Sequence, residues 1–254
     1  METQSQYGVR KAQVTIPTRD LLVVPHRDGI LTVSHPVFGS NPYDTNVVEM
    51  QRTYTHSQEL PQISFKEPTT SQSVSATAYE FPQRAKPQIF DKRWLQAGRI
   101  VRTNEGVIAN PPRDSNGAVI LDLDVLKAYI DNAKKIQVGK SNIYLGLNDF
   151  GFAPYETFQT GIQDAGTFAQ GGLARVIEHT EGPAENLRAI ASPKNYPRGV
   201  NVFGFKASKE PVERVLTLYS DGDLDGDRLD VGGVDWGSDG RDWYGGGGFA
   251  FGVL

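Results

Sequence analysis

The chain has 254 residues, no cysteine and a formal net charge of −4 at pH 7. This length suits one large domain, or one domain with an extension. The lack of cysteine excludes disulfides, thiolate metal sites and a cysteine nucleophile, and the mild negative charge argues against nucleic acid as the main partner.

The sequence also predicts a soluble protein without membrane insertion. Residues 1–20 contain no apolar core of the kind that a signal peptide needs. No apolar run approaches the length that spans a bilayer.

The first third of the chain predicts strands, turns and one short helix. Apolar residues at 21–24 and 30–33 lie on either side of Asp28-Gly29, a pair that tolerates a tight turn, and they predict a β-hairpin. Residues 43–82 are rich in Thr, Ser, Gln and Pro. We expect short strands and loops there, with a helix over 71–81.

The middle of the chain is more regular. Residues 99–103 and 106–109 are expected to pair across a short turn, and Asp122 or Asp124 can cap a helix that runs through 125–135. The later elements are expected to be a strand at 142–147, a helical region at 155–179 broken at Gly171-Gly172, a short helix at 184–191, and strands at 200–205, 213–220 and 248–253. Because strands and helices are segregated more than they alternate, the predicted class is α+β.

The acidic segment, residues 220–248, has the most unusual composition. It holds eight Asp and no Glu, two Arg and no Lys, and ten Gly. Single apolar residues are spaced through it: Leu224, Leu229, Val231, Val234, Trp236 and Trp243. Because such residues have little reason to stay in water, we expect them to be buried and the polar residues between them to be exposed.

One interpretation of this segment is a calcium loop, since alternate Asp residues can converge on one hard cation. The candidate ligands are Asp221, Asp223, Asp225, Asp227 and Asp230. An EF-hand started at Asp221 would have Gly232 where a bidentate Glu is required, and Arg228 where an apolar residue is expected. A calcium-stabilised adhesion or structural module therefore stays open as the alternative.

The sequence predicts no enzyme and no cofactor. The histidines, His26, His35, His56 and His179, are not in a zinc spacing or a triad signature. His179 ends a predicted helix, where a cation would meet the helix dipole. His26 lies beside the predicted turn and is expected at the surface.

The residues missing from the acidic segment point to a family. A codon of two adenines and a pyrimidine in which only the adenines are mutated cannot give Glu, Lys, Gln, Met or Trp. The segment lacks Glu, Lys, Gln and Met, and its two Trp residues occupy spaced anchor positions. This pattern resembles the variable region of the target proteins of diversity-generating retroelements, in which a reverse-transcriptase cassette rewrites adenines near the end of a gene.

Other stretches support the resemblance, which is to the archaeal variable proteins and covers about the last two-thirds of the chain. They are RWLQAGRIVRTNEGVIANPP, NDFGFAPYETF, GGLARVIEHTEG, NYPRGVNVFGF and the closing GFAFGV. The resemblance implies a C-type-lectin-like fold with small antiparallel sheets, two or more helices and long loops. We expect an N-terminal β/loop extension at 1–90, packed on a main C-type-lectin-like domain at 91–254 whose variable region is 219–248.

The resemblance also implies a function without catalysis, in which the variable region binds a protein or cell-surface ligand. The metal-site triplets of calcium-dependent sugar-binding lectins do not occur, so no bound metal is expected. The predicted ligand-binding residues are Asp221, Gly222, Asp223, Asp225, Gly226, Asp227, Arg228, Asp230, Asp235, Gly237, Ser238, Asp239, Arg241, Asp242 and Tyr244.

Overall fold

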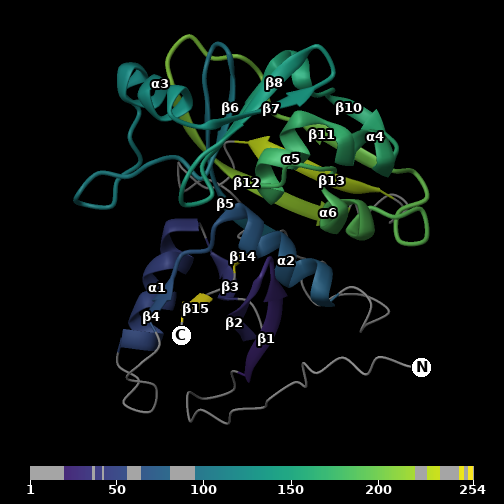
Figure 1. Ribbon diagram of the computed structural model, residues 1–254. Coiled ribbons are helices and arrows are strands. Elements are labelled where there is room, and N and C mark those ends of the chain that lie inside the picture. Colours follow the sequence, from purple (N-terminus) through teal and green to yellow (C-terminus); the bar gives the residue numbers. More distant parts are fainter. Residues whose placement is uncertain are drawn as a thin grey trace.

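The computed structural model describes residues 20–35, 38–41, 43–55, 64–80, 95–220, 228–234, 246–248 and 251–253. The predicted α+β class is confirmed, because the described residues form helices together with sheets whose strands pair mainly antiparallel. Figure 1 shows a small sheet in the lower part of the molecule and a large sheet with helices in the upper part.

The small sheet begins with the predicted hairpin. Strand β1 (Asp20–His26) pairs antiparallel with β2 (Gly29–His35) in continuous register from Asp20↔His35 to His26↔Gly29. Arg27 and Asp28 form the turn, one residue earlier than expected, and Arg27 adopts a positive φ of 50°.

The last strand of the chain lies inside this small sheet. The strand order is β1-β2-β15-β4, where β4 is Ser64–Lys66 and β15 is Phe251–Val253. Strand β14 (Gly246–Gly248) pairs both with β3 (Phe38–Asn41) and with the large sheet. The last strand of the described chain is therefore hydrogen-bonded to strands from its first third (Figure 1).

The large sheet has the order β10-β11-β13-β12-β5-β6-β9-β8-β7. Its strands are β5 (Leu95–Arg102), β6 (Gly106–Ala109), β7 (Lys134–Val138), β8 (Ser141–Leu145), β9 (Gly151–Pro154), β10 (Gly161–Gln163), β11 (Val200–Phe203), β12 (Val212–Ser220) and β13 (Leu229–Val234). Its β11–β13 pair is parallel, and β13 lies between β11 and β12. The predicted pairing of 99–103 with 106–109 is confirmed by the β5–β6 register.

Helices occupy the expected middle part of the chain. Helix α3 (Leu123–Asp131) begins after Asp122, whose carboxylate accepts hydrogen bonds from the backbone N–H groups of Asp124 and Val125. This confirms Asp122 as the cap. The helix was expected to continue to residue 135, but Lys134 and Lys135 belong to β7, where they pair with β8.

The predicted break at Gly171-Gly172 is also confirmed. Helices α4 (Ala165–Gln170) and α5 (Gly172–Glu178) meet there, and α6 (Glu185–Ile190) follows. A Cβ atom on Gly172 would lie 2.1 Å from Thr157 Oγ1, so only glycine allows this close approach. The expectation of helix from residue 155 was wrong, because Tyr155–Thr157 is a short 3-10 turn, η3, and β10 follows.

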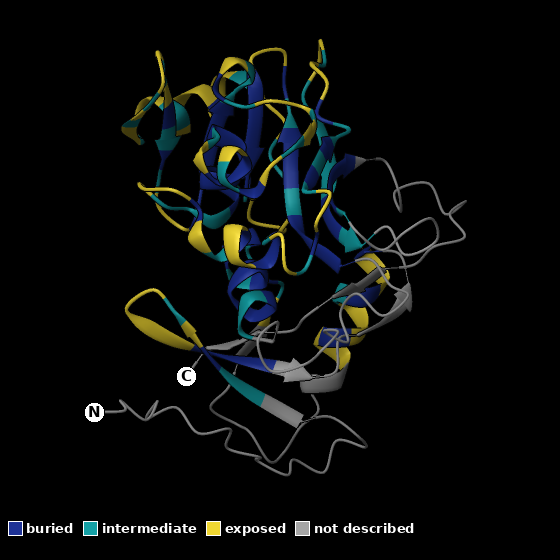
Figure 2. Cartoon of the chain, turned by 90° about the vertical axis from the view of Figure 1, so that its right-hand side faces the viewer, coloured by how far each residue is buried: buried dark blue, intermediate teal, exposed yellow. Residues whose placement is uncertain are grey.

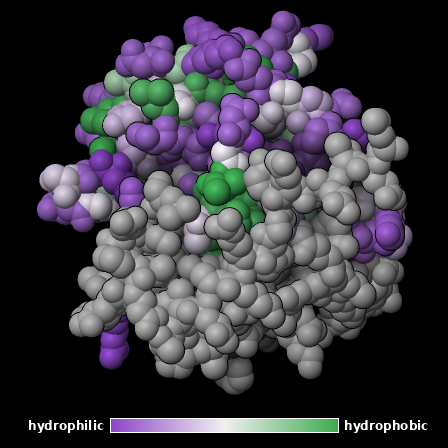
Figure 3. All heavy atoms as spheres, turned by 60° about the horizontal axis from the view of Figure 1, so that its bottom comes forward, coloured by the Kyte–Doolittle hydropathy of each residue, from purple (hydrophilic) through white to green (hydrophobic). Residues whose placement is uncertain are grey.

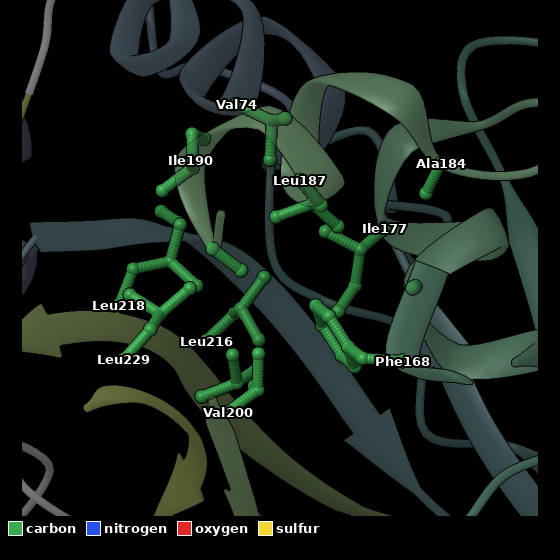
Figure 4. Close-up of a cluster of buried hydrophobic side chains, with 14 of the residues drawn as sticks. Val74, Phe168, Ile177, Ala184, Leu187, Ile190, Val200, Leu216, Leu218 and Leu229 are labelled. Atoms are coloured by element: carbon green, nitrogen blue, oxygen red, sulfur yellow. The ribbon is translucent and has the colours of Figure 1, made fainter. Parts of the chain in front are cut away.

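The main core lies between the large sheet and helices α2 (Thr70–Glu80), α4, α5 and α6. Figure 4 shows Leu216, Leu218 and Leu229 of the sheet facing Leu187 and Ile190 of α6. Figure 2 shows a buried interior, with exposed residues on loops and on the outer sides of helices. In the described part of the chain, no helix is both long and apolar enough to cross a membrane.

Helix α1 (Tyr43–Thr55) was not expected, since residues 43–82 were predicted as strands and loops apart from 71–81. Tyr43, Asn46 and Met50 are buried among its described side chains. The 71–81 prediction is confirmed by α2, which ends at Glu80.

An ion-pair network joins α1 and β4 to the large sheet. The guanidinium of Arg99 on β5 contacts the carboxylates of Asp44, Glu67 and Glu213, and it lies 4.9 Å over the Tyr43 ring. Burial lowers the pKa of Arg99, but these carboxylates outweigh burial and raise it. The network thus holds α1 and the end of β4 against the strand at the centre of the large sheet.

Candidate functional site

The acidic segment is divided by a strand that the sequence did not predict. Strand β13 lies in the interior of the large sheet and pairs on both sides. Leu229 and Val231 are fully buried on its core face, which confirms the expectation for these two apolar residues. The side chains of Leu224, Val234, Trp236 and Trp243 lie outside the described residues.

Arg228 and Asp230 are the predicted ligand-binding residues that the structure describes. The following lie outside the described residues: Asp221, Gly222, Asp223, Asp225, Gly226, Asp227, Asp235, Gly237, Ser238, Asp239, Arg241, Asp242 and Tyr244. These positions fall in two stretches of sequence, 221–227 and 235–245, that connect β12 to β13 and β13 to β14.

The expectation that Asp230 is exposed was wrong. Its relative exposure is 1%, and its carboxylate is fully engaged. Asn201 Nδ2 donates to Oδ1 at 2.7 Å, while Arg228 Nε and Nη2 donate to Oδ1 and Oδ2 at 3.1 and 3.3 Å. A buried carboxylate needs such partners, so Asp230 belongs to the supporting frame.

Residues on the neighbouring strands complete this frame. In the β11–β13–β12 register, Asn201, Asp230 and Tyr219 form one row across the sheet, and Phe203, Gly232 and Thr217 form the next. The rings of Phe203 and Tyr219 pack edge to face, with their centroids 6.0 Å apart. Sequence reasoning missed Asn201, although its place between Val200 and Val202 in a predicted strand puts it on the face opposite to theirs.

The glycines of β13 have a packing role. A Cβ atom on Gly232 would lie 2.7 Å from Thr217 Oγ1 and 2.8 Å from Phe203 Cζ. On Gly233 it would lie 2.6 Å from Phe205 Cε1. A larger residue at either position would overpack the sheet, so these glycines are part of the frame and not of a variable surface.

Of the candidate calcium ligands, the structure describes Asp230 alone. Asp230 would be the last ligand of the Asp run, yet Arg228 and Asn201 already bind its carboxylate. Among the described residues no group of three or more His, Cys, Asp or Glu side chains could hold a metal ion. The other Asp residues of the run lie outside the described part.

A second polar cluster surrounds Asp149, which follows β8. Thr69 Oγ1 and Ser71 Oγ donate to Asp149 Oδ2 at 2.5 and 2.9 Å, and Arg27 Nη1 lies 2.7 Å from Oδ1. Burial alone would raise the pKa of Asp149, but Thr69, Arg27 and Ser71 hold it below its usual value. Both carboxylate oxygens therefore have partners, and the cluster joins β1 and α2 to the large sheet.

Two histidines lie in this cluster, and the expectations for both need correction. His26 is half-buried, with Nδ1 2.9 Å from Ser75 Oγ, and is not a free surface residue. His179 follows α5 and places Nε2 2.9 Å from the Gly146 carbonyl oxygen. Burial lowers the pKa of both imidazoles, so the neutral form is favoured over the cation expected at the helix end.

Acid should therefore destabilise the protein through these histidines. An unfolded histidine titrates near pH 6.5, and a lowered pKa in the folded state means that the unfolded chain binds protons more readily. The stability contributed by the neutral imidazoles is complete above about pH 6.5 and is lost as the pH falls toward their folded pKa values. Asp149, with a lowered pKa, loses its contribution only below the carboxyl range near pH 4.

Urea unfolding at pH 7 and pH 5 measures this effect. We expect the free energy of unfolding to fall over this interval, and to fall less in a His26→Gln, His179→Gln double variant. Arg27, Asp149 and the two histidines are the charged or titratable groups facing one another here. Equal falls in the wild type and the double variant would show that other groups cause the pH dependence.

The described part of the face in Figure 3 is mainly hydrophilic, with hydrophobic atoms in small groups. Leu147 and Ile162 are the most exposed large apolar residues of the described chain, at 88% and 61%. Single exposed apolar residues are common on soluble proteins. They do not define a site here.

Comparison with known proteins gives one likeness in architecture. No protein-family model matches the chain, and no curated protein matches it. The chain is similar to a solved structure described as "Accommodation of massive sequence variation in Nanoarchaeota by the C-type lectin fold", with 13% sequence identity and a TM-score of 0.49. The alignment covers 93% of this chain and 97% of that chain. The likeness assigns no ligand and no partner.

Proposed function

We propose that this chain is a ligand-binding display protein with a C-type-lectin-like frame, and that its variable region, residues 219–248, presents the binding residues. In this proposal it is the target protein of a diversity-generating retroelement and binds a protein or cell-surface ligand without catalysis. The observation that carries the proposal is the position of β13. It fixes the middle of the variable region in the interior of the large sheet and leaves the acidic and glycine-rich stretches 221–227 and 235–245 on either side.

This division meets the physical requirement of a diversified surface. Substitutions away from the core and from special backbone sites change stability by about 0.5 kcal/mol or less, whereas truncation of buried Leu costs about 2–5 kcal/mol. Leu229, Val231, Gly232 and Gly233 are buried, and the first two belong to the main core. Sequence diversity and the core are thus carried by different residues, as in antibody loops on a rigid sandwich.

The proposal is tested by two matched libraries. One randomises Asp223, Asp227, Asp239 and Arg241, and the other randomises Leu229, Val231, Gly232 and Gly233. Protease resistance on yeast or phage measures the folded fraction. We expect most members of the first library to fold and few of the second, and selection from the first library should give binders to proteins that the parent does not bind.

Two results would contradict the proposal. Equally low folded fractions in both libraries would make 221–227 and 235–245 structural. A genome with no reverse-transcriptase gene and no near-identical template repeat beside this gene would remove the retroelement, although binding could still be tested with the first library.

A further inference from the structure

The far end of the variable region is held by the N-terminal part of the chain. Strand β15 pairs with β2 through Phe251↔Val33 and Gly252↔Thr32, and with β4 on its other side. Strand β14 pairs with β3 through Gly246↔Asn41. In sequence, 235–245 therefore connects β13 of the large sheet to β14, which pairs with β3 and with Leu95 of β5, and β15 then pairs with β2 and β4.

The hairpin that carries β15 is fastened to the large-sheet part of the molecule at its turn. Arg27, in the β1–β2 turn, forms an ion pair with Asp149 at 2.7 Å and donates to Ser71 Oγ at 3.1 Å. The Asp149 side chain is 10% exposed and that of Arg27 is 42% exposed. Asp149 lies between β8 and β9, far along the chain from the hairpin.

Backbone strain is concentrated at the same point. The described non-glycine residues with positive φ are Arg27, Asn110, Asn148, Asp149 and His179, with φ between 50° and 63°. Asn110 Nδ2 donates to the Asp149 carbonyl at 2.8 Å, and His179 lies 2.9 Å from the Gly146 carbonyl of the same turn. Such strain persists where surrounding contacts fix the backbone, and it clusters at functional positions.

The cluster also fixes α2 on the large-sheet part. Asn110 Oδ1 accepts from the Thr70 backbone N–H at 2.8 Å, and Thr70 Oγ1 donates to the Ile177 carbonyl at 2.7 Å. Thr70 is fully buried. The turn at Asp149 is therefore tied to α2 and to Asn110 by hydrogen bonds, while Arg27 extends to it from the hairpin.

We propose that Arg27 and Asp149 are positioning residues for the variable region. They fix the β1–β2 hairpin, and with it β15, in a set place relative to the large sheet, so that the strand that follows β14 is held on the same frame as β13 and β14. A role is thereby assigned to residues 20–66, outside the variable region. The positioning role does not depend on the proposed function. Its effect on ligand affinity does rest on that function, because preorganised loops lose less entropy on binding.

Hydrogen exchange of the full chain tests the inference without a ligand. Arg27→Gln and Asp149→Asn are compared with Glu181→Gln, which removes the exposed Lys134–Glu181 pair, whose side chains are 62% and 61% exposed. We expect about ten- to one-hundredfold faster exchange in peptides covering 20–35 and 249–254, the range that loss of a charge-assisted contact gives when it controls local opening. Peptides covering 212–220 and 229–234 should be unchanged, as should the Glu181→Gln protein.

A conservative variant tests whether the charge of Arg27 is enough, and two exchange results would contradict the positioning role. Arg27→Lys keeps the charge and should restore part of the protection at 249–254. The positioning role is overturned if Arg27→Gln leaves exchange at 249–254 unchanged, or if it accelerates exchange equally in 212–220. Because no ligand enters the measurement, either result leaves the proposed binding function standing, and loss of that function would leave this result standing.

Discussion

Replacing Leu229 with alanine is expected to lower the free energy of unfolding by about 2–5 kcal/mol, the cost of truncating a fully buried leucine. Leu229 has 0% exposure and belongs to the main core with Leu216 and Leu218 (Figure 4). It also begins β13, where it pairs with Val200 and Ser220. Urea unfolding followed by tryptophan fluorescence measures the change.

The control lies a few residues away in the same acidic segment. A triple variant, Asp223→Ala, Asp227→Ala and Asp239→Ala, should fold with little loss of stability if these residues carry ligand contacts and not the fold. If the triple variant loses as much stability as Leu229→Ala, the Asp residues are structural. A calcium-bound module would then become the better interpretation of the segment.

Elements set by local signals could be predicted from the sequence. The β1–β2 hairpin has two apolar runs around a turn pair, and α3 has Asp122 at its start with Leu126 buried on one face. In each case the residues that determine the element lie within a few positions of one another. Such signals are readable from one sequence.

Elements set by tertiary contacts could not be predicted from the sequence. Strand β13 reads LDVGGV, in which two glycines weaken the strand signal. It becomes a strand because β11 and β12 pair with it on both sides and Phe203 and Phe205 fill the space above the glycines. Helix α1 is rich in Thr, Val, Asn and Tyr, which are poor helix formers, and the buried polar Asn46 interrupts its apolar face.

The same distinction applies to the candidate site. The apolar residues Leu229 and Val231 could be recognised because burial follows from residue type. The burial of Asp230 could not be predicted, since its carboxylate depends on contact with Asn201, 29 positions earlier in the chain. The Asp149 cluster was missed for a similar reason, because Arg27, Ser71 and Asp149 come from three distant parts of the chain.

Arg99→Ala is expected to destabilise the protein by about 3 kcal/mol, at the lower end of the cost of breaking a buried ion pair. Its side chain is 16% exposed and serves Asp44, Glu67 and Glu213, whose side chains are 72%, 13% and 30% exposed. The estimate stays low because the exposed pair with Asp44 is screened by water and because Arg113 and Tyr43 still contact Glu67 in the variant. Thermal or urea unfolding measures the change.

Arg188→Ala is the matched control, since Arg188 pairs with Glu185 on the surface of α6 and both side chains are more than half exposed, at 57% and 63%. It should cost about 0.5 kcal/mol or less. The difference between the two variants isolates the buried contacts of Arg99, which link α1 and Glu67 to the large sheet. If Arg99→Ala and Arg188→Ala lower the free energy of unfolding equally, the Arg99 network contributes little to stability. The frame around the variable region then depends on strand pairing by β14 and β15 and on the Arg27–Asp149 contact.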